Sequence, residues 1–147
     1  MKTLISLLII LCTTLLGSCH KEDPAITVTD NWVRATAEGQ DVGAAYMTIK
    51  SKTDMTLVKV ESSAAEIVEI HNMSFENGVM KMRMLEQLDL TANTPSRLAP
   101  GENHLMLFDF KKPLKLGDTV QFSLHFKDKL GKETLISIES PVLTEHP

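Results

Sequence analysis

Apolar and polar residues alternate along most of this chain with a period of two residues. Such alternation is typical of β-strands that bury one face, and no segment has the 3.6-residue period of an amphipathic helix. Gly, Pro, Asn and Asp separate the alternating segments, as expected for turns. Strands are therefore predicted over residues 26–29, 32–36, 44–49, 55–61, 68–75, 79–85, 104–110, 119–126 and 133–142, with short strand and turn over 88–98.

This arrangement of about eight short antiparallel strands predicts an all-β domain, either a sandwich or a Greek-key barrel. A chain of 147 residues fits a single domain of this kind. Its formal net charge of −4 provides no basic stripe, which argues against a nucleic-acid partner. The sequence also lacks a Cys-x-x-Cys motif, a glycine-rich phosphate loop and a recognisable catalytic triad, so an enzyme is not expected.

The clearest turn is Asn77-Gly78, which separates two predicted strands. Asn-Gly between alternating segments is the strongest short-range indication of a β-hairpin. If these two residues form the loop, the numbers of cross-strand partners sum to 155 (77 + 78), and Met73 lies opposite Met82. One face of the hairpin then contains His71, Met73, Phe75, Met80, Met82 and Met84, and the other contains Asn72, Ser74, Lys81 and Arg83.

His71, Met82, His104 and Met106 have the chemistry of a soft metal site. Position 71 is diagonal to position 82 on the hairpin, roughly 7–8 Å away, which is within reach of two long side chains. His104 and Met106 project to the same side of their strand because alternate residues share a face. Thioether sulfur and imidazole suit Cu(I), whereas Mg²⁺, Ca²⁺ and Mn²⁺ prefer oxygen ligands. Imidazole must be neutral to bind, so affinity should fall as the pH drops through about 6.5.

These residue types do not by themselves decide between a metal site and a hydrophobic core. Methionine fills irregular gaps well and is more often a core residue than a ligand. By that argument Met47, Met55, Met80 and Met84 are expected to pack in the core. A structural or interaction protein whose methionines are all core is therefore an open alternative.

The first residues resemble an export signal. A positive start at Met1-Lys2 precedes an apolar segment over residues 3–16 and the sequence Leu16-Gly17-Ser18-Cys19. This ending resembles a bacterial lipobox and predicts a signal peptide over residues 1–18, lipidation of Cys19, a tether over 19–25 and a domain over 26–147. An ordinary signal peptide or a retained anchor helix is the alternative. The predicted mature chain has no cysteine besides Cys19, so a blue-copper electron-transfer site, which needs one, is not expected.

Several motifs together resemble the periplasmic copper chaperones of the PCu(A)C family. The family signature is His, ten residues, Met, twenty-one residues, His, one residue, Met, and both gaps match here. The resemblance also includes Trp32-Val33-Arg34-Ala35-Thr36, Gly43-Ala44-Ala45-Tyr46-Met47, Leu98-Ala99-Pro100-Gly101 and the turn over residues 112–118. Some members have a tail rich in His and Met, whereas this chain ends in His146-Pro147.

The resemblance implies a cupredoxin-like β-barrel and a surface Cu(I) site. The ligands that it implies are His71, Met82, His104 and Met106. It further implies a carrier that delivers copper to the binuclear copper centre of cytochrome c oxidase. With the N-terminal prediction, this places a lipid-anchored copper chaperone on a membrane of the cell envelope, facing the periplasm. Copper buffering and a purely structural lipoprotein are the alternatives.

Overall fold

A computed structural model describes residues 25–145, and all the secondary-structure elements in this range are β-strands. The part of the chain that is described contains no helix long and apolar enough to cross a membrane. The predicted signal peptide, Cys19 and the C-terminal His146-Pro147 lie outside it. The strands are β1 (Ile26–Arg34), β2 (Val42–Ser51), β3 (Met55–Ser62), β4 (Ala65–Glu76), β5 (Val79–Leu85), β6 (Leu88–Leu90), β7 (Ser96–Leu98), β8 (His104–Phe110), β9 (Thr119–Asp128) and β10 (Glu133–Leu143).

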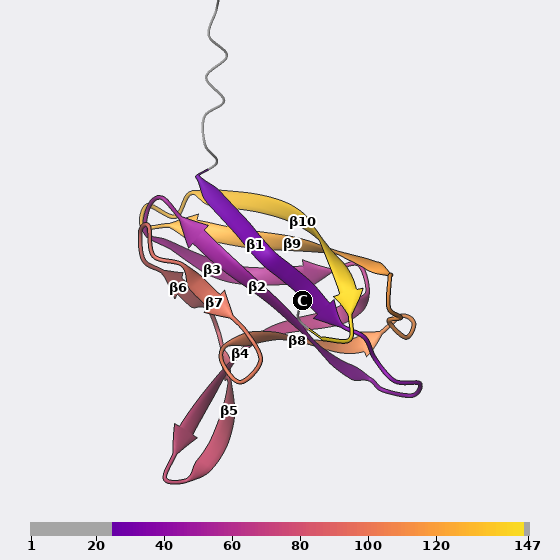
Figure 1. Cartoon of the computed structure of the whole chain (residues 1–147). Helices are drawn as coiled ribbons and strands as arrows, with labels where there is room; N and C mark the ends of the chain where they lie inside the picture. Colours follow the sequence, from indigo (N-terminus) through magenta and orange to yellow (C-terminus); the bar gives the residue numbers. More distant parts are fainter. Residues whose placement is uncertain (1–24, 146–147) are drawn as a thin grey trace, which may run out of the picture.

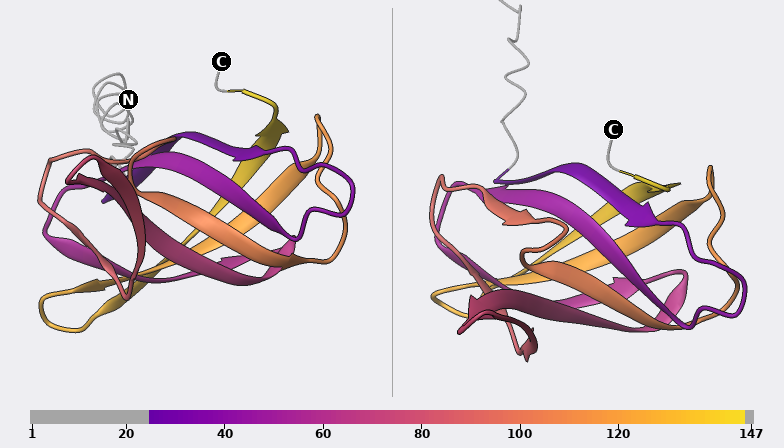
Figure 2. Two further views of the ribbon diagram at one scale, coloured as in Figure 1. Left: turned by 90° about the horizontal axis from the view of Figure 1, so that it is seen from below. Right: turned by 60° about the horizontal axis from the view of Figure 1, so that its bottom comes forward.

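The strands form an open sandwich of two layers (Figures 1 and 2). One layer has the order β5-β4-β8-β2-β1, with β7 beside β2, and the other has the order β10-β9-β3-β6. The parallel pair β1–β10 connects the two layers. Strands β5 and β6 lie at the two ends of this path, so the sheet is not closed.

The prediction of an all-β cupredoxin-like fold is confirmed, with differences in detail. The structure has ten strands rather than about eight, because the segment 88–98 contributes two strands of three residues each. The two segments predicted over 26–36 form the single strand β1, with a register shift between Thr29 and Trp32. Asp30 lies in this irregularity with a φ of 51°. One pair of strands is parallel, and the sandwich is open rather than a closed barrel.

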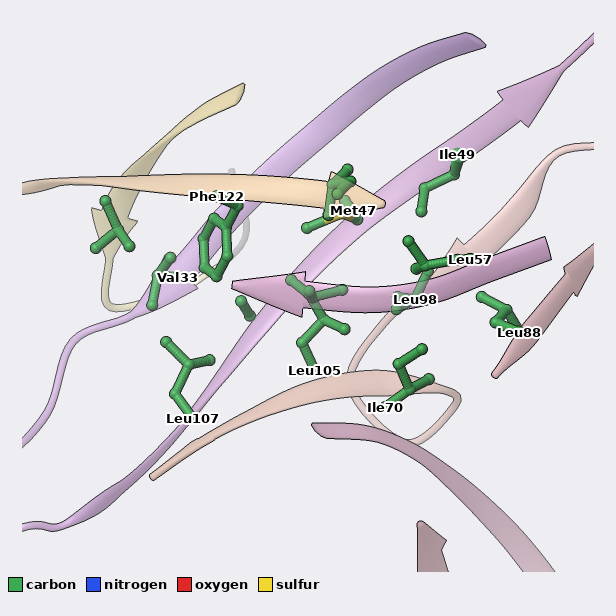
Figure 3. Packing of buried hydrophobic residues seen from close by; sticks show 14 of the residues in the cluster. Val33, Met47, Ile49, Leu57, Ile70, Leu88, Leu98, Leu105, Leu107 and Phe122 are labelled. Carbon is green, nitrogen blue, oxygen red and sulfur yellow. The ribbon is translucent and has the colours of Figure 1, made fainter. Parts of the chain in front are cut away.

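Apolar side chains from both layers fill the space between them (Figure 3). Leu105 and Leu107 of β8 are fully buried here, as alternation along that strand predicts. Met47 and Met55 also belong to this core, as expected. The other large, fully buried members include Val33, Ile49, Leu57, Leu98, Leu114, Val120, Phe122, Leu124 and Phe126.

The β4–β5 hairpin extends from one edge of the sandwich (Figures 1 and 2). Its loop residues Asn77 and Gly78 have φ values of 51° and 79°, the conformation that a two-residue hairpin needs. The predicted register is confirmed over all seven pairs, from Ile70–Leu85 to Glu76–Val79. The expectation that Met80 and Met84 are core residues is wrong: they are 50% and 56% exposed, because they share the face of His71, which points away from the second layer.

Candidate metal centre

His71 and His104 meet on the outer face of the first layer. They are direct partners in the antiparallel β4–β8 pair, and their ring centroids are 6.1 Å apart. The next side chain across the sheet is Tyr46 of β2, whose ring lies 6.4 Å from that of His104. Antiparallel pairing thus brings together two imidazoles that are 33 positions apart in the sequence (104 − 71).

Met106 lies two residues beyond His104 and points to the same face, opposite Glu69 of β4. The intervening Leu105 points into the core. The predicted alternation along β8 is therefore present, and it separates candidate ligands from core residues one by one.

Met82 projects from β5 and is 49% exposed. It is opposite Met73, the residue two positions after His71, as the hairpin register predicts. Met82, His104 and Met106 all line one open pocket of about 330 Å³, together with Met73. Three of the four predicted ligands thus share a pocket, and the fourth, His71, lies beside it as the strand partner of His104.

The hydrogen bonds of His71 leave one of its nitrogens unused. Its Nε2 lies 2.7 Å from Oε2 of Glu69, and a carboxylate can only accept, so Nε2 holds the proton. Its Nδ1 is buried and has no hydrogen-bond partner among the described residues. A buried acceptor left unpaired costs roughly 1–3 kcal/mol, which a bound metal ion would offset. The pairing of a ligand histidine with a carboxylate is common at metal sites.

His104 is held in the complementary way. Its Nδ1 lies 2.9 Å from the backbone carbonyl oxygen of Glu102 and donates to it, because a carbonyl only accepts. This leaves the lone pair of Nε2 available. Each imidazole is therefore oriented by a fixed acceptor on one nitrogen, which leaves its other nitrogen as the candidate metal ligand.

An aromatic and cationic wall borders the pocket on the side of β1 and β2. The guanidinium carbon of Arg34 is 5.7 Å from the ring centroid of Tyr46 and 6.0 Å from that of Trp32. Burial raises the pKa of Tyr46 above its ordinary value, and nearby Arg34 only partly offsets this. The phenol therefore stays neutral at physiological pH and supports the ring of His104 rather than supplying a negative ligand. Trp32 is buried against Tyr46 on this outer face.

Sequence reasoning did not identify Glu69 or this wall as parts of the site. Glu69 is two residues before His71, so alternation alone could have placed both side chains on one face. The position of Arg34 over Tyr46 depends on the β1–β2 pairing, and no local sequence pattern indicates it.

Comparison with known proteins identifies the family. A family model described as "Putative lipoprotein LpqE-like" matches residues 26–142. The chain belongs to the LpqE-like family. This LpqE-like chain is 31% identical over 111 residues to "Putative lipoprotein Lxx21020" of Leifsonia xyli, covering 74% of the chain and 66% of that protein. It is 29% identical over 116 residues to "Uncharacterized protein RP573" of Rickettsia prowazekii, covering 75% and 64%. The match thus spans just under two thirds of each relative.

Solved structures share the fold of this LpqE-like chain. The "Copper-bound PCuAC domain from PmoF2" superposes with a TM-score of 0.65 at 22% identity, covering 83% of this chain and 95% of that domain. The apo form of DR1885 from Deinococcus radiodurans gives a TM-score of 0.58 at 26% identity, covering 86% and 85%. A Cu(I) form of DR1885 has also been solved, with a TM-score of 0.59 at 24% identity, covering 88% and 83%. The predicted relation to PCu(A)C domains is confirmed for the fold.

Proposed function

We propose that this protein is a copper carrier that binds one Cu(I) ion through His71, Met82, His104 and Met106. The observation that supports this most directly is the His71–His104 pair. Each ring has one nitrogen held by an acceptor, which leaves the other as a candidate ligand next to a pocket lined by the two thioethers. The solved copper forms of proteins with this fold agree with the proposal.

The ligand set explains the preference for Cu(I). Two thioethers and two neutral imidazoles add no charge, so the bound ion keeps a single positive charge. Thioether sulfur favours soft Cu(I) over divalent ions that seek oxygen. Glu69 provides a negative charge behind His71, which increases the basicity of that ligand. A site without thiolate also cannot be lost to disulfide formation in an oxidising compartment.

The position of the ligands suits a carrier rather than an enzyme. Met82 is exposed on the projecting hairpin, so an acceptor can reach the ion from that side. Release then proceeds by exchange of neutral ligands for acceptor ligands that bind more tightly. No change in the oxidation state of copper is needed.

We further propose, from the resemblance to PCu(A)C proteins, that the acceptor is the binuclear copper centre of cytochrome c oxidase. To test this, the Cu(I)-loaded protein is mixed anaerobically with the metal-free acceptor domain, and the copper content of each is measured after separation. Copper should move to the acceptor. Retention by this protein would instead favour copper buffering.

The proposed location is a membrane of the cell envelope on the periplasmic side, with Cys19 as the lipid-bearing first residue after removal of residues 1–18. The lipoprotein descriptions of the family and of the Leifsonia xyli relative support this proposal. Mass spectrometry of the N-terminal peptide, with Cys19→Ser as the control, tests it. An unmodified N-terminus in the membrane fraction would contradict it.

The deciding experiment is an anaerobic Cu(I) titration of the fragment beginning at His20 against a chromophoric chelator. We expect one tight equivalent in the wild type, weaker binding in Met106→Ala, and loss of the tight site in the His71→Ala/Met82→Ala double variant. Circular dichroism checks that the variants keep their fold. If the wild type does not compete for copper, or if the variants lose their fold rather than copper, the methionines are structural and the carrier proposal is wrong.

A further inference from the structure

The hairpin presents more sulfur than the proposed copper centre uses. Met80, Met82 and Met84 occupy alternate positions on β5, and all three are about half exposed, at 50%, 49% and 56%. Met73 of β4 shares their face as the partner of Met82. Methionine usually fills irregular gaps in a core. These exposed methionines do not have that role.

The register places three of these thioethers close together. In a two-residue hairpin the closing pair Glu76–Val79 is hydrogen-bonded, so the pairs Met73–Met82 and His71–Met84 are of the alternate, non-hydrogen-bonded type. Side chains in such pairs approach most closely, with Cβ atoms roughly 4.5–5.5 Å apart. On this face the two neighbouring pairs form a four-cornered group of side chains. Three corners are Met73, Met82 and Met84, which we call the hairpin methionines, and the fourth is His71.

The base of the hairpin is also the part best supported by the sandwich. The pair Ile70–Leu85 lies directly next to Met84, with Ile70 in the core and Leu85 packed against it. Met80, in contrast, is nearer the loop and opposite Phe75, which is 70% exposed. The three thioethers at the base are thus better fixed for shared ligation than Met80 is.

We propose that the hairpin methionines form a second, weaker binding site for a soft monovalent metal ion, Cu(I) or its analogue Ag(I). Three neutral thioethers match the preference of such an ion, and the carboxylate on this face, Glu69, is hydrogen-bonded to His71. The face between residues 71 and 84 contains no Leu, Ile or Val. The apolar residues of this face are four methionines and Phe75, so sulfur predominates on it.

This site has a place in the transfer of copper to and from the proposed centre, a role that rests on the carrier proposal above. Met82 belongs to both sets, and Met73 lines the pocket that contains His104 and Met106. An ion bound first by the hairpin methionines moves inward when Met73 and Met84 are exchanged for the imidazoles and Met106. Met82 stays bound throughout. All ligands are neutral, so the step moves no proton or electron and the ion remains monovalent.

The test uses the full chain in detergent, with ¹³C-labelled methionine methyl groups, and Ag(I) as a redox-inert probe. In a His71→Ala/His104→Ala background, Ag(I) should shift the methyl resonances of the hairpin methionines. Met47 and Met55, which are buried, should not respond and act as internal controls. Adding Met73→Leu and Met84→Leu should weaken Ag(I) binding by at least the roughly 10- to 100-fold typical of lost support at metal sites. Met80→Leu is the matched control and should bind as its parent does.

The Leu substitutions separate sulfur chemistry from apolar contact, because Leu and Met have similar volume and hydrophobicity. If Met73→Leu/Met84→Leu binds Ag(I) as well as its parent, the hairpin site does not exist and the face is an apolar docking surface. If the wild type binds one tight ion but the double-histidine variant shows no shift at Met73 and Met84, the hairpin site is wrong and the carrier stands. If shifts occur only at the hairpin and the wild type has no tight site, the hairpin site exists and the carrier proposal is wrong.

A second measurement does not depend on folding of the double-histidine variant. With both histidines intact, stopped-flow uptake of Cu(I) from a chelated donor should slow several-fold in Met73→Leu/Met84→Leu, more than the equilibrium affinity falls. An equal fall in rate and affinity, or no change in rate, would contradict a transfer role for these thioethers.

Discussion

Met47 in the core of the sandwich is 1% exposed, whereas Met82 on the β4–β5 hairpin is 49% exposed. Both lie on β-strands, and both belong to the same layer. Met47 faces the second layer and contacts apolar side chains from it. Met82 lies where no second layer covers the sheet. The same residue type therefore packs in the core in one region and offers an accessible sulfur atom in the other.

The two regions also differ in how firmly their strands are held. β2 has neighbours on both sides, β1 and β8. β4 pairs with β8 only as far as His71, and β5 has β4 as its single neighbour. Local opening of the hairpin exposes little core and should cost far less than global unfolding. This suits a segment that exchanges ligands with an acceptor.

The largest expected effect is on the stability of the metal-free protein. Met47→Ala should lower the free energy of unfolding by about 2–5 kcal/mol, because it leaves a cavity between the layers. Met82→Ala should change it by no more than about 0.5 kcal/mol, as for an exposed residue. Urea unfolding followed by circular dichroism measures both. Equal losses in the two variants would place Met82 in the core after all.

Copper binding should show the opposite order. Met82→Leu removes the sulfur but keeps the apolar volume, and it should weaken Cu(I) binding by about 10- to 100-fold or more. Met47→Leu makes the same chemical change in the core and should leave the Cu(I) affinity unchanged. Competition with a chromophoric chelator provides the comparison. If Met82→Leu and Met47→Leu bind Cu(I) with similar affinity, Met82 is not a copper ligand.

Glu69 tests the orientation of His71 without touching a proposed ligand. Glu69→Gln keeps the size of the side chain but removes the charge that accepts from Nε2 of His71. Cu(I) affinity should fall by about tenfold, the lower end of the range for partners behind metal ligands. Glu66→Gln, an exposed glutamate on the same strand, is the control. An unchanged affinity in Glu69→Gln would show that this hydrogen bond does not matter to the site.

The smallest effect compares two carboxylates as the pH changes. A hydrogen bond from Lys129 lowers the pKa of Asp54 in the body, and one from Lys81 lowers that of Glu76 in the hairpin. A lowered pKa stabilises the fold above the ordinary value, which is 3.8 for Asp54, and that contribution disappears as the pH falls through the folded-state pKa. Asp54→Asn should therefore lower the urea midpoint slightly at pH 7 but not in strong acid.

Glu76→Gln should leave the global midpoint unchanged and should increase only the amide exchange of the hairpin, because the hairpin opens independently. A shift of the global midpoint in Glu76→Gln as large as that in Asp54→Asn would contradict the distinction between the two regions.

Local features explain why some predictions from sequence succeeded. The hairpin register followed from Asn77-Gly78, since a two-residue loop determines which residues face each other. The separation of His104 and Met106 from Leu105 followed from alternation along one strand. Predictions that depended on distant strands did worse. The short strands β6 and β7 exist because β3 and β2 are there to pair with them, and no periodicity can develop over three residues.

The error over Met80 and Met84 has the same origin. Alternation showed that these residues share a face with Met82, but a hairpin has two faces, and the pattern does not say which of them another layer will cover. Nor could the sequence show that Glu69 would hydrogen-bond to His71, because that depends on rotamers within the assembled sheet.

The amino-acid sequence alone specifies most of the longer strands, the hairpin and its sulfur-rich face, because these depend on backbone geometry over a few neighbouring residues. The tertiary structure decides that His71 lies opposite His104, that the pocket includes Met82 and Met106, and that the hairpin methionines stay exposed. Those outcomes depend on pairing between β4 and β8 and on where the second layer ends. Both are long-range contacts, whose free energy comes from burying the whole core rather than from any local pattern.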